Sequence, residues 1–203
     1  MLYSLARWVF RAYLKLFLRW RVDGVERVPA EGAVIVCGNH YHWMDPVAVA
    51  CALRRPVHFM AKEELFRFKP FGALLRIARA YPVRRGAVDR SALKKTFELL
   101  EQGEVVGIFP EGTRSKTGEL GKAEPGVGLF AHRARVTVLP FGIAGSYRPF
   151  RRLTIIFGQP MRFDSLYDQK LRSEQVLTAI TEPIMAEVAA LRAAAKATLG
   201  RTD

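Results

Sequence analysis

The sequence predicts an α/β domain, with a β-sheet layered between helices, preceded by an amphipathic N-terminal helix. Short apolar runs rich in β-branched residues alternate with segments of helical periodicity, which is typical of layered α/β folds. The chain has 203 residues and half of them are hydrophobic, enough for one domain with a substantial core. No repeat or long linker divides it, so we expect residues 1–21 to form the helix and residues 22–203 a single domain.

The first 20 residues, MLYSLARWVFRAYLKLFLRW, form the predicted N-terminal helix. Arg7, Arg11, Lys15 and Arg19 leave neither an uncharged signal-peptide core nor the run of about 20 apolar residues that spans a bilayer. At about 100° per residue the four cations share one arc of roughly 120°. The opposite arc is apolar: Leu2, Leu5, Val9, Phe10, Tyr13, Leu16, Phe17 and Trp20. This pattern favours a helix in the membrane interface, with cations toward lipid phosphates, over an ordinary helix packed on the domain.

Several apolar runs have the length of strands, and several segments have the periodicity of helices. The predicted strands are residues 33–37, 57–61, 105–109, 136–141 and 153–157. The predicted helices are residues 47–53 after Pro46, 71–80, 91–102 with Gly103 as C-cap, and 173–199 with Pro183 inside. In such folds the loops at strand ends carry the functional residues.

The chain is strongly basic, with 32 Lys and Arg against 19 Asp and Glu and a net charge of +13. Such a surface suits nucleic acid, an acidic protein, a phosphorylated substrate or an anionic membrane. Zinc-finger spacing, an aromatic-glycine RNA-binding signature and a lysine-rich arm are all missing from the sequence, so we expect no nucleic-acid partner. Cys37 and Cys51 lie in apolar runs without metal-ligand spacing and are interpreted as buried, reduced thiols, which favours the cytoplasm.

The stretch CGNHYHWMDP, residues 37–46, places two histidines and an aspartate close together. A metal site needs at least three protein ligands, and only His58 and His132 remain, outside any cluster, so we expect no metal. His40 and Asp45 are able to pair only where the chain turns, and the predicted strand end and helix start supply that turn. The alternatives are an N-cap role for Asp45, which precedes a proline, and a surface position for His40.

A second group of polar residues also follows predicted strands. In IFPEGTRS, residues 108–115, Gly112 lets the backbone approach a ligand, Thr113 offers a hydroxyl, and Arg114 offers a planar fork for phosphate or carboxylate. Lys62 follows another strand, and YPVRRG, residues 81–86, carries two adjacent arginines. Taken alone, residues 108–115 would be interpreted as a tight surface turn, and each cation as a solvated surface charge.

Together, and in this order, these segments resemble the lysophosphatidic acid acyltransferases, the 1-acyl-glycerol-3-phosphate acyltransferase family of the glycerolipid acyltransferases. The resemblance spans about residues 22–159. Asn39 and His40 with Asp45 resemble the family's His-x4-Asp motif. Residues 81–85 stand at its second block, residues 109–115 reproduce its third, and residues 138–143 resemble its fourth. The family fold implied is a layered mixed β-sheet flanked by helices.

The resemblance implies acyl transfer to the free sn-2 hydroxyl of lysophosphatidic acid, giving phosphatidic acid. His40 would be the general base that takes the hydroxyl proton during attack on an acyl thioester, a contribution of ~10²–10⁴-fold. Asp45 would hold the imidazole tautomer, and His42 would be a bystander that lines the site. The donor would be acyl-CoA or acyl-carrier protein as co-substrate, with no cofactor. The protein would work peripherally at the cytoplasmic face of the cell membrane.

The same resemblance assigns the acceptor site. Lys62, Arg85 and Arg114 would meet the acceptor's phosphate, and Glu111 would orient its glycerol. Gly112 and Thr113 belong to the same substrate-binding loop. Backbone amides near Gly112 or in the His40 turn would stabilise the oxyanion.

Three departures from the family pattern leave the acceptor headgroup open. Arg79 and Arg84 stand where relatives usually carry Gly and Asp, and Glu124 precedes Pro125 and Gly126 where relatives usually show Lys-x-Gly. The alternatives are another lysophospholipid or lyso-aminolipid acceptor, or, from a different class, a non-enzymatic basic protein that binds membranes or nucleic acid.

Overall fold

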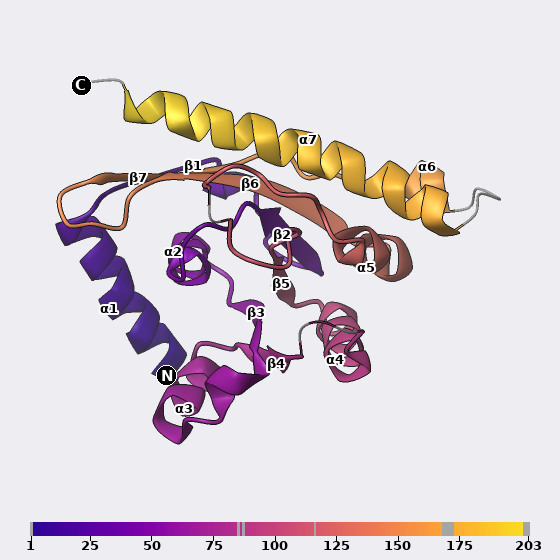
Figure 1. The fold of residues 1–203 in the computed structure, drawn as a ribbon, viewed down its shortest axis with the longest axis horizontal. Coiled ribbons are helices and arrows are strands. Elements are labelled where there is room, and N and C mark those ends of the chain that lie inside the picture. The colour runs from indigo at the N-terminus through magenta and orange to yellow at the C-terminus, as the bar shows by residue number, and fades with distance from the viewer. Residues whose placement is uncertain (1, 85, 87, 116, 168–172, 201–203) are drawn as a thin grey trace.

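The computed structural model describes residues 2–84, 86, 88–115, 117–167 and 173–200. It confirms the α/β class, because a mixed β-sheet has helices against both of its faces (Figure 1). Within these residues the sheet has seven strands in the order β1-β7-β6-β2-β5-β3-β4, and every neighbouring pair is parallel except β6–β7. The strands are β1 Arg19–Asp23, β2 Val34–Gly38, β3 Val57–Lys62, β4 Tyr81–Val83, β5 Val105–Ile108, β6 Thr137–Gly145 and β7 Arg152–Phe157.

The helices form the outer layers, and the longest of them, α7, runs along β6 and β7 (Figure 1). The α-helices are α1 Leu2–Phe17, α2 Asp45–Ala52, α3 Lys69–Ile77, α4 Arg90–Glu101, α5 Gly126–Ala134, α6 Asp164–Tyr167 and α7 Ser173–Leu199. Two short 3-10 helices are η1 Val25–Arg27 and η2 Glu63–Phe66. The predicted C-terminal helix is confirmed, and it continues through Pro183.

Strand β2 shows how one apolar run serves two layers. Val34 and Val36 pack toward α1 and α2, whereas Ile35 and Cys37 pack toward α4, α5 and α7. All four side chains are fully buried. Alternate residues of a strand face opposite sides of a sheet, so a strand covered by helices on both sides is apolar throughout.

Helix α1 is amphipathic as predicted, but its arginines face the protein. Arg7 donates hydrogen bonds to the carbonyls of Leu53 at 2.9 Å and Arg54 at 2.7 Å. Arg11 donates to the carbonyl of Cys51 at 3.1 Å. These carbonyls lie at or just beyond the C-terminus of α2, where unpaired C=O groups and the helix dipole favour a cation. The expectation that these two cations face lipid phosphates is therefore wrong.

The outward side of α1 is instead largely apolar. Leu14 and the following Leu18 are buried in the core, which fixes the helix on the domain. Lys15 remains exposed. The exposed hydrophobic side chains of this helix are Leu2, Leu5, Trp8, Val9, Leu16 and Phe17.

The structure also has six elements that the sequence patterns did not predict, namely β1, β4, α5, α6, η1 and η2. The N-terminal helix ends at Phe17, and β1 begins at Arg19, so the expected boundary at residue 21 falls inside a strand. Strand β4 contains Pro82, which is tolerated because β4 is the last strand of the sheet. Helix α5 contains two glycines, which lower its helix propensity. Helix α3 begins at Lys69, two residues earlier than predicted.

Arg11→Ala should lower the free energy of unfolding by about 1 kcal/mol, because it removes the hydrogen bond to Cys51 that holds α1 on α2. Lys15→Ala, on the same helix but exposed, should change it by less than about 0.5 kcal/mol. Urea unfolding of both variants checks this. Equal losses would mean that the α1–α2 contact contributes nothing specific.

Candidate active site

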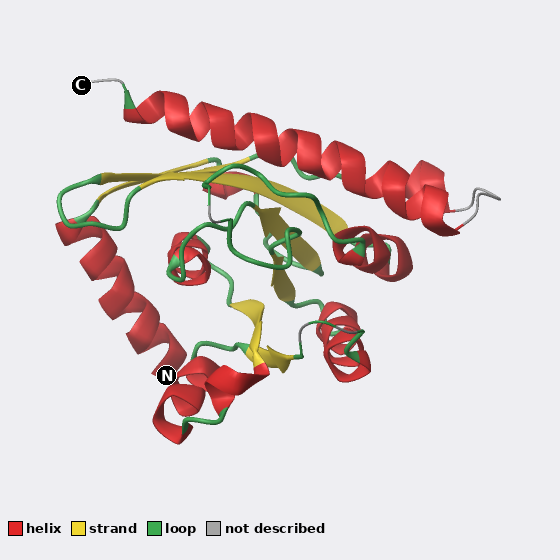
Figure 2. Cartoon of the chain, in the orientation of Figure 1, coloured by secondary structure: helices red, strands yellow, loops and turns green. Residues whose placement is uncertain are grey.

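Most of the described residues singled out in the sequence lie at one edge of the sheet. Strands β2, β5, β3 and β4 are parallel to one another, so their carboxyl ends lie at the same edge. The loops that leave these strands, together with the end of β6, meet there (Figures 1 and 2). This is the edge at which open α/β sheets bind ligands. We call it the carboxyl edge.

His40 and Asp45 pair at this edge, as the sequence predicts. The imidazole Nδ1 lies 2.8 Å from Asp45 Oδ2. Asp45 is fully buried, and His40 is 8% exposed. Asp45 is the first residue of α2, and no side chain caps that helix, so the N-cap alternative is wrong. The surface alternative for His40 is wrong as well.

The Asp45 carboxylate accepts four hydrogen bonds from described residues. Besides His40, the backbone N–H groups of Tyr41 and His42 donate to Oδ2 at 2.8 and 2.7 Å. The Tyr147 hydroxyl donates to Oδ1 at 2.7 Å. Burial, and then the charge of Asp45, raise the pKa of Tyr147 well above its usual value, so its hydroxyl remains a donor. Four donors and a buried position suit an ionised carboxylate.

The tautomer of His40 follows from these contacts. Because Asp45 is an acceptor, Nδ1 carries the hydrogen, and in the neutral imidazole Nε2 then has a free lone pair. No residue that the structure describes donates a hydrogen bond to Nε2. Phe109 stacks on the imidazole with ring centroids 4.1 Å apart and planes 18° apart, which holds the ring in one orientation. His40 is thus arranged to accept a proton at Nε2.

Asn39 makes the turn before His40 possible. Its side-chain amide donates to the carbonyl of Ile143 at 3.0 Å, and its side-chain oxygen accepts from the Ile143 N–H at 2.8 Å. The side chain thereby continues the pairing of β2 with β6 after the backbone of β2 has left the sheet. At Gly38, an added Cβ would lie 2.3 Å from the Phe141 ring and 2.5 Å from its carbonyl oxygen, so only glycine fits.

Glu111 joins the two loops of the site. Its Oε1 accepts from the His40 N–H at 3.0 Å, and its Oε2 accepts from the Gly121 N–H at 2.8 Å. The Ser115 N–H donates in turn to the carbonyl of His40 at 2.8 Å. Glu111 is 7% exposed, so its carboxylate supports the backbone around His40. Its predicted contact with glycerol stays a prediction.

The predicted substrate-binding residues are not all placed by the structure. Gly112 has a φ of +63°, a left-handed conformation that suits glycine, and it turns Thr113 and Arg114 outward, where both are exposed. Burial, and to a smaller extent the Arg114 charge, lower the pKa of His42, so Arg114 lies near enough to act on this imidazole. Lys62 is exposed at the end of β3. Arg85 lies outside the described residues.

His42 lies beside the His40–Asp45 pair, and its expected role as a bystander stays a prediction. Its ring stacks on Tyr147 with centroids 4.4 Å apart, and its Nδ1 accepts from the Met44 N–H. Burial is the main reason why the pKa of His42 is lowered, so it is neutral at neutral pH. Across the described ranges, no three His, Cys, Asp or Glu side chains converge as a candidate metal site. Cys37 and Cys51 are buried free thiols.

The two arginine departures lie in different places. Arg79 is near Tyr3, with its guanidinium 5.6 Å from the ring centroid, and near Glu104, which precedes β5. It is therefore at the opposite edge of the sheet from His40. The guanidinium of Arg84 lies 3.7 Å from Asp89 at the carboxyl edge. Only Arg84 is in a position to influence the acceptor.

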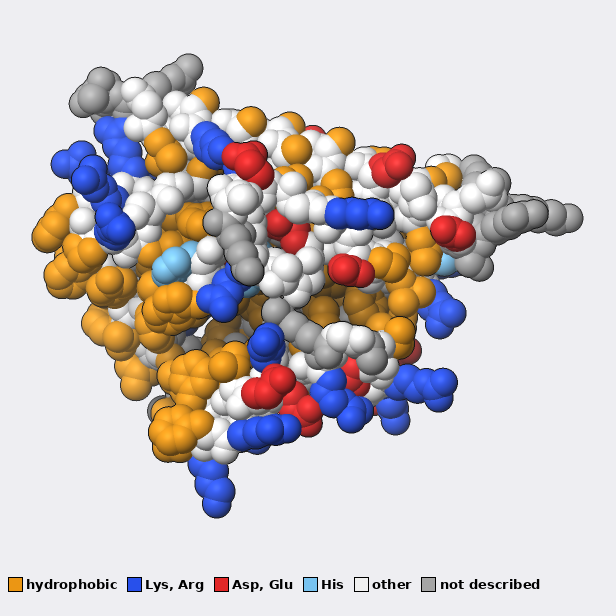
Figure 3. Space-filling model, viewed as in Figure 1, with side chains coloured by type: hydrophobic (Ala, Val, Ile, Leu, Met, Phe, Trp, Pro, Cys, Tyr) orange, Lys and Arg blue, Asp and Glu red, His pale blue; other side chains and the backbone are white. Residues whose placement is uncertain are grey.

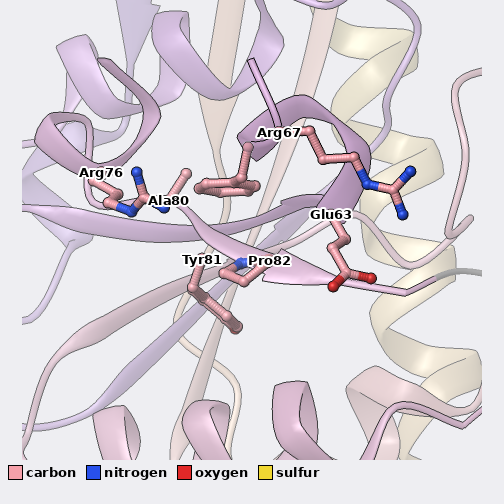
Figure 4. Close-up of a pocket in the computed structure, with 7 residues that line it drawn as sticks. Glu63, Arg67, Arg76, Ala80, Tyr81 and Pro82 are labelled. Atoms are coloured by element: carbon pink, nitrogen blue, oxygen red, sulfur yellow. The ribbon is translucent and has the colours of Figure 1, made fainter. Parts of the chain in front are cut away.

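A cavity of about 480 Å³ lies beyond β4, between η2 and α3 (Figure 4). Figure 4 shows Glu63 and Arg67 on one side of it, with Tyr81 and Pro82 of β4 below. His40 does not line it.

Comparisons with known proteins agree with this geometry. The family described as Acyltransferase matches residues 19–144, which is more than half of the chain. The chain belongs to this family. A 1-acyl-sn-glycerol-3-phosphate acyltransferase of Bacillus subtilis is 31% identical over 170 residues, which cover 81% of this chain and 83% of the relative. One from Streptococcus pneumoniae is 27% identical over 187 residues, covering 84% and 69%.

A solved structure supports the fold. The crystal structure of the 1-acyl-sn-glycerophosphate acyltransferase PlsC from Thermotoga maritima superposes with a TM-score of 0.69 at 24% identity. The match covers 95% of this chain and 80% of that one. The family match and the Bacillus subtilis relative show that the protein is an acyltransferase, so the alternative of a non-enzymatic basic protein is set aside.

Tyr147 and Phe109 carry site roles that the sequence patterns did not assign. The predicted strand 136–141 stops short, whereas β6 continues to Gly145. Had the strand been extended, Tyr147 would have been recognised as the first aromatic residue after a parallel strand, at the same edge as His40. Phe109 was recognised only as part of the third block, because stacking between two loops leaves no sequence signal.

Tyr147→Phe should lower kcat on the order of tenfold, because Asp45 then loses one of the four donors that hold its carboxylate against the His40 imidazole. Tyr41→Phe is the matched control, because the Tyr41 hydroxyl donates to the carbonyl of Gly145 and not to Asp45. Steady-state kinetics of both variants measures this. An unchanged kcat for Tyr147→Phe would contradict its role in orienting Asp45.

Glu111→Ala should lower kcat at least ~10-fold and the free energy of unfolding by about 3 kcal/mol, because two amides lose their acceptor. The KM for the acceptor should stay the same. Steady-state kinetics and urea unfolding measure these quantities. A higher acceptor KM with unchanged kcat and stability would instead support the glycerol-orienting role.

Proposed function

We propose that the protein transfers a fatty acyl group from a thioester donor to the sn-2 hydroxyl of lysophosphatidic acid, with His40 as general base. The observation that supports this most is the buried His40–Asp45 pair, which leaves Nε2 free to accept a proton. The acceptor hydroxyl gives its proton to Nε2 while its oxygen attacks the thioester carbonyl. The tetrahedral intermediate then expels the thiolate, which takes the proton back from the imidazolium. Asp45 stabilises that imidazolium and keeps its ring oriented.

The acceptor's phosphate is proposed to bind the cations of the carboxyl edge. Lys62 ends β3, and Arg114 lies in the loop after β5. Both are exposed at this edge, so both are available to a ligand. Arg85 is proposed for the same role from its sequence position. A guanidinium pairs with two phosphate oxygens at once, which makes Arg114 a more selective phosphate contact than Lys62.

The oxyanion is proposed to bind amides of the loop after Gly112. The N–H groups of His40 and Gly112 already donate to Glu111 and to the Phe109 carbonyl. Within the part of the chain that the structure describes, the N–H groups of Thr113 and Arg114 donate to no residue. They are therefore the available donors on this loop.

The donor is proposed to be acyl-CoA or acyl-carrier protein, as a co-substrate and without a further cofactor, and both are acidic partners suited to the +13 charge. We further propose peripheral attachment to an anionic membrane, at its cytoplasmic face, through the exposed apolar side of α1. None of the described helices is long and apolar enough to cross a bilayer.

Acyl transfer from a labelled long-chain acyl-CoA to a panel of acceptors tests this function. The panel contains lysophosphatidic acid, glycerol-3-phosphate, lysophosphatidylcholine and an ornithine-type lyso-lipid. We expect product only with lysophosphatidic acid. Product with a different acceptor alone would keep the chemistry and move the acceptor to another lyso-lipid, with Arg84 as the residue to examine.

Arg114→Ala should raise the KM for lysophosphatidic acid on the order of tenfold or more, because it removes a charged hydrogen bond to phosphate. The KM for the acyl donor should change little. Lys94→Ala, an exposed cation on α4, serves as the control for a loss of charge. Equal increases in both KM values would contradict a phosphate-binding role for Arg114.

A further inference from the structure

The hairpin formed by η2 and α3, residues 63–77, exposes an apolar side that the chemistry does not use. Its exposed side chains include Leu65, Phe68, Phe71 and Leu74, with Phe68 69% and Leu74 43% exposed. Phe68, Phe71 and Leu74 are three residues apart, so at about 100° per residue they share an arc of roughly 120°. A cluster of this kind on a protein surface marks an interaction site.

Helix α3 packs closely on η2, so the apolar side of the hairpin faces away from this contact. A Cβ added at Gly72 would lie 2.7 Å from the carbonyl oxygen of Phe66, which shows how closely α3 crosses η2. The guanidinium of Arg76 lies 5.7 Å from the centroid of the Phe66 ring. These contacts occupy the inner side of α3 and leave Phe68 and Leu74 without a partner there.

The hairpin lies on the same side of the molecule as the exposed side of α1. Arg79 follows α3, and its guanidinium lies over the Tyr3 ring of α1. This contact joins the two elements. Figure 3 shows hydrophobic side chains gathered along α1 and again over α3, with a hollow in the surface between α2 and α3. At the other end, η2 follows Lys62 directly, and Trp43, three residues after His40, is 60% exposed.

The charges on the hairpin indicate which partner this surface takes. Arg67 and Lys69 flank Phe68 in the sequence and are both exposed, whereas Arg76 lies over Phe66 on the inner side of α3. Aromatic and leucine side chains flanked by cations are the composition of segments that lie in the interface of an anionic bilayer. The acceptor proposed above is itself a lipid of such a bilayer, and in this respect the inference rests on the proposed function.

We propose that the η2–α3 hairpin is a second bilayer-binding element, and that α1, the hairpin and Trp43 form one surface for anionic lipid around the approach to His40. The protein then rests on the bilayer at two separated points. The lyso-lipid acceptor reaches the carboxyl edge between them without crossing water.

A fluorescent label tests the contact directly in the full chain. Phe68→Cys and Val88→Cys each carry a nitrobenzoxadiazole label. Val88 serves as the control, because its side chain is 79% exposed in the loop before α4. Cys37 and Cys51 are buried, so the label goes to the introduced cysteine. With vesicles of equal parts phosphatidylglycerol and phosphatidylcholine, the label at 68 should shift to shorter wavelength and the label at 88 should not. A water-like spectrum at 68 in vesicle-bound protein would overturn the proposal.

Substitutions in the hairpin test how much it contributes to vesicle binding. Phe68→Ser with Leu74→Ser should lower vesicle partitioning on the order of tenfold, and Val88→Ser should leave it unchanged. The double variant should lose turnover on vesicle-embedded lysophosphatidic acid and keep it on a water-soluble short-chain analogue. Wild-type partitioning by the double variant would overturn the proposal. If the wild type acylates no acceptor, the proposed function fails while partitioning still decides this inference.

Discussion

The buried carboxylate of Asp45 is the constraint on which the site depends. Removing a carboxylate from water costs several kcal/mol unless hydrogen-bond donors replace the lost hydration. Here the donors come from two backbone amides of the preceding turn, the imidazole of His40 and the hydroxyl of Tyr147 after β6. The turn, the imidazole tautomer and the approach of β6 are therefore fixed by one requirement.

The parallel sheet makes this arrangement possible, and the surrounding loops stabilise it. Asn39 continues the β2–β6 pairing past the strand end, so the chain turns with its backbone groups satisfied. Glu111 then supports the His40 amide from the neighbouring loop. At this site, Nε2 of His40 and the amides of Thr113 and Arg114 have no partner among the described residues, and these are the groups that the proposed acyl transfer uses.

The sequence predicted those features that depend on local pattern. Buried strands and long helices follow from periodicity, and the pairing of His40 with Asp45 follows from a turn between a strand and a helix. Helix α1 was predicted correctly, but its orientation was predicted wrongly, because only the packing of α2 shows which carbonyls bind Arg7 and Arg11. The role of Tyr147 depends on an approach across 102 residues, which no spacing along the chain reveals.

The central claim is that His40 is the base, and one rate tests it most directly. Thiol release from acyl-CoA is followed with saturating lysophosphatidic acid for the wild type, His40→Ala and the control His42→Ala. If His40 is the base, His40→Ala loses ~10²–10⁴-fold in kcat while it remains folded, and His42→Ala keeps most of the activity. A folded His40→Ala protein with kcat within about tenfold of the wild type would show that His40 is not the base.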